Sequence, residues 1–452
     1  MNRPTHAALR VLAVLVAATC TAGVAGALDL QAALRAAEAE DPTLAAARAN
    51  RDGALENLPL ARARLLPQLS LQASENRLRQ ETTTQNAIFG PQTTEFNGPS
   101  RNAQLVLRQT LYRPRDKIGV DIGALQVEYG KLKLESATSD LWLRTTGAWL
   151  DLLSATSQLD AGEEVVPAVE RAAAQARARL ASGDGTRDAV VEAEAQVAAA
   201  RARLFDSQAI VAARQSNLAL ITNQALASLV GGRLPQLLPA PLAADDGEYV
   251  ALVLARNPEL RAAEVVRIVA DLRVRQVGAD SKPTIDFVAS AVQAANDTSS
   301  TLGSRYRIGQ YGVQLSVPLY TGGALSAGGR QAAAQARASA SDRDAYAQQL
   351  RQRVTVLWQS ERGLRERIVA SSTLVESARE QLRAAEQGVR HGQRSIGDIS
   401  NAATLVGSRQ RDLVDLRQQL LSTQVQLLAM LPVDEPLWAG WIGQLESLAS
   451  AR

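Results

Sequence analysis

The chain has 452 residues, of which 46% are hydrophobic, 21% charged and 4% aromatic, and its 49 basic and 46 acidic residues leave a formal net charge of +3. So small a surplus over that length excludes the footprint of a nucleic-acid-binding protein, and no nucleic acid partner is expected. Beyond residue 30 no apolar run approaches the roughly 18 residues of a membrane helix, which excludes a polytopic helical membrane protein. The remaining classes are a soluble helical protein and a membrane protein that spans by strands.

Residues 1–27 have the pattern of a secretory signal peptide. Arg3 and Arg10 precede the apolar run VLAVLVAA, and small residues follow up to Ala27. The alternative is a lipoprotein acylated at Cys20, but the residues before that cysteine lack the usual leucine. We therefore expect cleavage after Ala27.

Cleavage would remove both the only cysteine, Cys20, and His6, so that His391 is the single imidazole of the mature chain. Thiol catalysis, histidine-rich zinc sites and Ser-His-Asp triads then lack their residues. We expect no enzymatic activity, no catalytic residues, no cofactor and no bound metal.

An internal repeat organises the chain into two halves, residues 28–240 and 241–452. Asp41-Pro42 and Asn257-Pro258 are 216 residues apart, and the same offset aligns Pro67 with Pro283. The seam between the halves is the stretch LPAPLAADD. Each half is expected to begin with a helix and to continue through strand, loop, strand and long helices.

The strand, loop and strand segments are expected at about 68–112 in the first half and about 284–320 in the second. Alternating apolar residues mark the strands, whereas the polar stretches 77–102 and 296–305 are expected to be loops. Strands of about nine residues tilted near 45° can cross a bilayer. A sheet of four strands with open edges would leave backbone groups unpaired in lipid, so closing it into a barrel requires more than one chain. Three chains would give twelve strands, and two or four copies would also close the sheet.

Long helices are expected at about 117–230 and about 324–430, followed by a short C-terminal segment that contains Trp438 and Trp441. The stretch from Lys117 to Leu180 would measure roughly 95 Å if continuous, but Pro167 predicts a kink or a break. The next helix is expected to run to about residue 229. Apolar residues repeat every seven positions in both halves, which indicates supercoiled helices. These two series, here called the apolar ladders, are Val190, Val197, Leu204, Val211 and Leu218 in the first half and Ile399, Val406, Leu413, Leu420 and Leu427 in the second.

On four segments the chain resembles the TolC family of outer membrane channel-tunnels of Gram-negative bacteria. They are LLPQL at 65–69, SVPLYTGG at 316–323, Ala148-Trp149 with Leu152-Leu153, and RHGQRSIGDI at 390–399. The resemblance implies a mainly α fold with a small β part: a homotrimer with a twelve-stranded barrel in outer membrane lipid and a coiled-coil helical barrel that extends into the periplasm. It further implies a periplasmic adaptor protein and an inner membrane transporter of the ATP-binding cassette or resistance-nodulation-division type as partners.

The resemblance also implies a periplasmic entrance at the turns around residues 183–189 and 392–398. Asp398 and Asn401 lie three apart on one helix face, and copies of Asp398 would form a carboxylate ring at the constriction. Arg394 matches a gate arginine of the family, and we expect it to form a latch with Asp188.

Gly322 and Gly323 follow a predicted strand. Because glycine tolerates strained backbone, they are expected to form the hinge between barrel and helix.

The function that these features favour is an exit duct of a tripartite export system. It would carry protein, as in the branch of the family that serves type I secretion, or small molecules together with a resistance-nodulation-division pump. The third possible function is that of a periplasmic coiled-coil scaffold whose short alternating segments form soluble hairpins.

Overall fold

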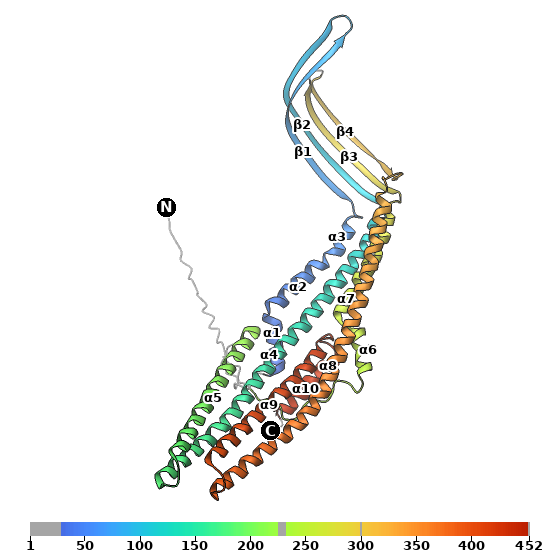
Figure 1. The fold of residues 1–452 in the computed structure, drawn as a ribbon. Coiled ribbons are helices and arrows are strands. Elements are labelled where there is room, and N and C mark those ends of the chain that lie inside the picture. Colours follow the sequence, from blue (N-terminus) through green and yellow to red (C-terminus); the bar gives the residue numbers. More distant parts are fainter. Residues whose placement is uncertain (1–28, 225–231, 299–300, 451–452) are drawn as a thin grey trace, which may run out of the picture.

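The computed structural model describes residues 29–224, 232–298 and 301–450, so the predicted signal peptide lies outside the described residues. Figure 1 shows an elongated molecule with a curved four-stranded sheet at one end and two helical turns at the other. The fold is mainly α with a small β part, as expected. The helices are α1 (Leu30–Glu40), α2 (Pro42–Leu55), α3 (Asn57–Ala63), α4 (Pro114–Ser182), α5 (Arg187–Thr222), α6 (Asp246–Arg256), α7 (Pro258–Ala279), α8 (Ala324–Arg390), α9 (Ile396–Leu428) and α10 (Pro436–Ser450); the strands are β1 (Gln68–Asn86), β2 (Gly90–Tyr112), β3 (Thr284–Thr298) and β4 (Thr301–Ser316).

The repeated pairs Asp41-Pro42 and Asn257-Pro258 each begin a helix. The side chain of Asp41 accepts a hydrogen bond from the Leu44 N–H at 2.8 Å, and that of Asn257 accepts one from the Leu260 N–H at 2.8 Å. The proline that follows each cap occupies the first helical position, where no N–H is needed. The two copies of the motif therefore begin α2 and α7 by the same device.

The strands of the first half are longer than expected. β1 and β2 pair without interruption from Gln68 opposite Arg108 to Asn86 opposite Gly90, so the prediction of a loop over 77–102 is wrong. The segment is rich in threonine, which favours strands, and each backbone group on the inner side finds a partner across the hairpin. The polar composition indicated exposure to water and not the absence of a strand.

The second hairpin differs from expectation at both ends. β3 and β4 run into the predicted loop 296–305, of which residues 299–300 lie outside the described part. β4 ends at Ser316 and not near residue 320. Pro318 follows two residues later, and its missing N–H cannot contribute to a sheet.

α4 is one helix of 69 residues, about 100 Å long, that passes through Pro167. The predicted break is therefore wrong. The neighbours Ala168 and Val169 are buried in a cluster that includes Ala200 and Ala403, and this packing holds the backbone helical across the lost hydrogen bond. α5 ends at Thr222, earlier than predicted, because Asn223 adopts a left-handed conformation with φ of 51°; residues 225–231 are outside the described part.

α4, α9 and α10 share one hydrophobic core cluster. Trp149, Leu421 and Trp438 lie in one core cluster, so α10 is part of the helical body, as expected for a packed C-terminal segment. The seam packs there too: Arg365 donates to the Pro239 carbonyl at 2.8 Å. The apolar ladder of α9 is buried throughout, whereas that of α5 is half-buried except at Leu218.

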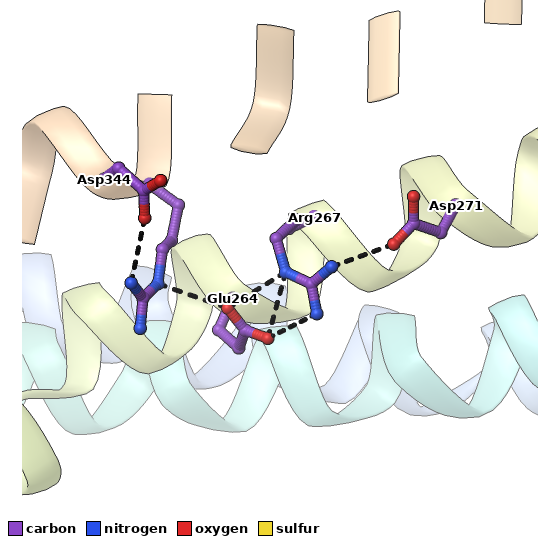
Figure 2. Close-up of polar contacts among 5 residues, drawn as sticks. Glu264, Arg267, Asp271 and Asp344 are labelled. Atoms are coloured by element: carbon purple, nitrogen blue, oxygen red, sulfur yellow. Dashed lines mark hydrogen bonds and ion pairs between the residues drawn. The ribbon is translucent and has the colours of Figure 1, made fainter. Parts of the chain in front are cut away.

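A chain of ion pairs joins α7 to α8 between the core and the sheet (Figure 2). Glu264 accepts from Arg267 at 2.7 Å and pairs with Arg343 of α8 at 3.2 Å, and Asp271 and Asp344 extend the chain on either side. These groups are a third or more exposed, so each pair adds at most about 1 kcal/mol. Of these pairs only Glu264 with Arg343 connects α7 to α8, and the others lie within one helix.

Candidate functional site

The four strands present one apolar and one polar face. Leu69, Leu107, Ala289 and Tyr311 form one row across the sheet, and Leu71, Leu105, Ala291 and Gly309 form the next. Because side chains alternate along a strand, Ile285, Phe287, Val313 and Leu315 lie on this same face. The opposite face, here called the polar face, carries Gln68, Ser70, Gln72, Gln104, Arg108, Asp286, Ser290, Gln310 and Gln314, with Val106, Val288, Val292 and Ile308 among them.

The apolar face is open to its surroundings. Leu69 is 66% exposed, Leu71 71% and Leu315 62%, although all three belong to ordered strands. So continuous an exposed apolar surface marks an interface with lipid or with another protein. On β2 it extends over Ala103 to Leu111, nine residues, the length of a tilted strand that crosses a bilayer.

The sheet has two unpaired edges, β1 and β4, because its order is β1-β2-β3-β4. Along each edge a row of backbone N–H and C=O groups has no partner within the chain. An edge of this kind cannot stand in hydrocarbon. The sheet is therefore an incomplete membrane element in a single chain.

A buried acid fastens the sheet to the helices. The Asp286 carboxylate, 3% exposed, accepts hydrogen bonds from Arg108 at 2.6 Å and from Arg113 at 2.7 Å. Arg113 also lies 3.6 Å from Asp116 in the first turn of α4. A buried charge is tolerated only when it is paired in this way. Sequence reasoning missed this cluster, although an acid between Ile285 and Phe287 was a visible signal.

Gly322 and Gly323 lie at the corner between β4 and α8, as expected. Their φ angles of 60° and 87° are in the left-handed region, which strains any residue with a Cβ atom. The equivalent corner of the first half has Pro114 at the first position of α4. The corner therefore requires glycine in one half and proline in the other.

The two helical turns at the far end of the molecule share one design. Gly183 after α4 and Gly392 after α8 have φ angles of 83° and 69°, and Thr186 and Ser395 then cap the next helices. Arg179 of α4 donates to the Val389 carbonyl of α8 at 2.7 Å and so ties the two hairpins together. Sequence reasoning missed Arg179, because nothing in the pattern around it shows a backbone partner 210 residues away.

Asp398 lies in the first turn of α9 and is part of a capping box. Its carboxylate accepts from the Ser395 N–H at 2.9 Å, and its own N–H donates to the Ser395 hydroxyl at 3.3 Å. Asn401 follows on the same helix and is exposed. The structure thus places both predicted constriction residues at the end of the molecule opposite the sheet.

Arg394 and Asp188 are both exposed at these turns, and neither is among the ion pairs that the described residues form within one chain. The side chain of Arg394 lies over Gly388, where an added Cβ would come within 2.8 Å of its Cγ. The pairing of Arg394 with Asp188 stays a prediction.

No cluster of three or more His, Cys, Asp or Glu side chains in residues 29–224, 232–298 and 301–450 could hold a metal ion. Among the helices described there, not one is both long and apolar enough to traverse a bilayer.

The outer membrane efflux protein family matches the chain over residues 33–224 and 250–432. The protease secretion protein PrtF of Dickeya chrysanthemi is 25% identical over 427 residues, which are 91% of this chain and 90% of that protein. The alkaline protease secretion protein AprF of Pseudomonas aeruginosa is 26% identical, over 86% of this chain and 81% of that protein.

The fold is shared with a solved structure as well. The outer membrane protein VceC of Vibrio cholerae superposes with a TM-score of 0.75 at 20% identity, covering 89% of this chain and 95% of that one. The family match, which extends over most of both halves, confirms the resemblance found in the sequence. The chain belongs to the outer membrane efflux protein family, the channels of TolC type that form an exit duct in the Gram-negative outer membrane and extend into the periplasm.

Proposed function

We propose that three copies of this chain close into one channel with a twelve-stranded barrel. The observation that supports it most strongly is the open sheet, whose exposed apolar face ends at the two unpaired edges β1 and β4. These edge strands have 19 and 16 residues, so β4 of one copy can pair with β1 of the next over most of their length. Pairing around the ring gives the backbone N–H and C=O groups of both edge strands hydrogen-bond partners, which they need because hydrocarbon offers none.

The helical turns at the opposite end then form the periplasmic entrance. Three copies of Asp398, with Asn401 one turn along, make an acidic constriction that attracts cations and repels anions. Arg394 pairs with Asp188 of a neighbouring copy and holds the entrance closed. Gly322 and Gly323 serve as the hinge between barrel and helices. The channel is a passive duct with no catalytic role.

For cargo we propose protein, exported by type I secretion with an ATP-binding cassette transporter and a periplasmic adaptor. Support comes from the two relatives named for protease secretion, which this chain matches over roughly nine-tenths of its length. Small-molecule efflux with a resistance-nodulation-division transporter is the second candidate, because the family as a whole is described by efflux.

Assembly is tested by measuring the oligomer mass and the single-channel conductance of the purified protein in one detergent. A trimer with small, long-lived, cation-selective openings is expected. A soluble oligomer that does not insert into a bilayer would instead support a periplasmic scaffold.

Cargo is tested in a Gram-negative strain that lacks its own channel of this family but keeps a protease transporter and adaptor. Protein secretion predicts that this chain restores protease to the medium. Restored dye efflux without protease in the medium would support the second candidate.

A further inference from the structure

The apolar face of the sheet ends abruptly on the side away from the helices. Beyond the row of Leu71, Leu105, Ala291 and Gly309, the next row is Ala73, Ala103, Gln293 and Arg307, and the one after it is Glu75, Arg101, Ala295 and Arg305. Within two rows the leucines are replaced by a mixture of alanine and polar residues that includes Arg101, Arg305 and Arg307.

These arginines lie on the face that is apolar elsewhere and not on the polar face. At the same level the polar face carries Ser74, Asn102, Ala294 and Tyr306, none of them charged. Arginines that served a passing substrate would belong on the polar face, which lines the channel once the barrel closes. The cluster is therefore placed to contact what surrounds the barrel.

The position of the cluster along the strands indicates which layer of the membrane it contacts. The apolar stretch of β2 below it has nine residues, Ala103 to Leu111, and the only polar side chain pointing with them is Gln109, whose amide donates to the Leu65 carbonyl at 2.8 Å. A tilted strand of that length crosses the hydrocarbon core. Because the helices extend into the periplasm, Arg101, Arg305 and Arg307 lie at the headgroups of the outer leaflet.

Arginines outnumber carboxylates among the described side chains at this level. Four arginines, the three above and Arg77 on the next row of β1, stand against one carboxylate among the described side chains of these rows, that of Glu75. Glu75 binds Arg101 at 2.8 Å, which holds that guanidinium against the sheet, while Arg305 and Arg307 are exposed. Asp297 follows Ala295 by two residues on β3, and its side chain is outside the described part. Among the described side chains, Glu81 and Glu95 lie six residues further along β1 and β2, roughly 20 Å away.

We propose that Arg77, Arg101, Arg305 and Arg307 form a binding site for the phosphate groups of outer-leaflet glycolipid. The planar guanidinium group suits a phosphate oxygen pair. Arginines on β2 and β4, which are separated by Ala295 of β3, can hold two phosphates of one headgroup. The leucine rows directly below receive the acyl chains. The site rests on the outer membrane placement of the sheet and not on the nature of the cargo.

The test measures lipid retention by native mass spectrometry of the purified channel after incubation with bisphosphorylated lipid A. The wild-type channel should retain it, and dephosphorylated lipid A and phosphatidylethanolamine should be lost. In the double variant Arg305→Gln and Arg307→Gln the affinity should fall at least tenfold, because each basic residue near a charged membrane surface contributes on the order of 1 kcal/mol. The matched control removes two exposed arginines of α8, Arg351→Gln and Arg367→Gln, and should bind as the wild type does.

Two outcomes would overturn the site: equal retention of phosphorylated and dephosphorylated lipid A by the wild type, or undiminished binding by the double variant. Retention of phosphatidylglycerol as strong as that of lipid A would assign the cluster to anionic lipid in general and refute a glycolipid site. If the double variant does not assemble, the salt dependence of wild-type binding decides, since phosphate contacts must weaken as sodium chloride rises. A channel that conducts ions but does not bind lipid A would refute the glycolipid site without contradicting the proposed duct function.

Discussion

Replacing Leu315 by arginine tests which face of the sheet meets the lipid. Leu315 is 62% exposed on the apolar face and lies opposite Ile285. It is eight residues from Arg307 along β4, roughly 26 Å, or about 19 Å in depth at a tilt near 45°. Arg307 is level with Ala103 and Leu315 with Tyr112, so Leu315 lies at the helical end of the apolar stretch and the new charge would lie near the inner boundary of the hydrocarbon.

Near that boundary an arginine costs up to about 1 kcal/mol for each chain. A cost of about 1 kcal/mol is roughly a fivefold loss in the equilibrium of insertion, and three copies in a trimer multiply it to roughly a hundredfold. We expect little assembled oligomer in the outer membrane. The assay compares the oligomer with total chain on semi-native gels of outer membrane fractions.

The matched control is Gln314→Arg, one residue away. Gln314 is exposed on the polar face opposite Asp286, whose carboxylate already binds Arg108 and Arg113, so the new charge is directed to water. This variant should assemble as the wild type does. Normal assembly of Leu315→Arg, or equal damage by the two variants, would refute the assignment of the faces.

Asp398→Asn should raise the permeability of the channel to anions relative to cations in bilayer recordings, and the amide keeps an acceptor for the Ser395 N–H; unchanged selectivity would remove Asp398 from the constriction. Arg394→Ala should increase conductance by loosening the closed end, and a variant with wild-type openings would exclude Arg394 from the latch. Burial and the nearby Asp29 raise the pKa of Glu446 to about 7. The folded state therefore holds this proton more tightly, so its stabilising effect is complete below about pH 4.5 and is lost as the pH rises through about 7. Thermal unfolding of the wild type should show this loss relative to Glu446→Gln, and parallel pH profiles would contradict it.

Much of the architecture could be predicted because it depends on local chemistry. The cap and proline pairs at Asp41 and Asn257 stabilise a helix start wherever they occur. The glycines at 183, 322 and 392 mark left-handed turns that other residues avoid. Alternation of leucine with polar residues shows the two faces of a strand before its partner is known.

The predictions that failed concern segments where a distant partner outweighs local preference. The polar stretch 77–102 is strand because its own hairpin supplies the hydrogen bonds, and α4 continues through Pro167 because buried neighbours support it. Neither effect is visible from composition or from one residue type.

The sequence by itself determined the class of this protein: two similar halves, strands that alternate, helices too long for a globular domain, and the residue types at each turn. Only the tertiary structure decided which groups meet across the chain. Asp286 joins Arg108 and Arg113 from segments more than 170 residues away, and Arg179 reaches the Val389 carbonyl. The arginine rows above the apolar face likewise became a cluster only through the register of four strands. The physical reason is that a pairing register is a property of two segments together, whereas caps and turns are properties of one.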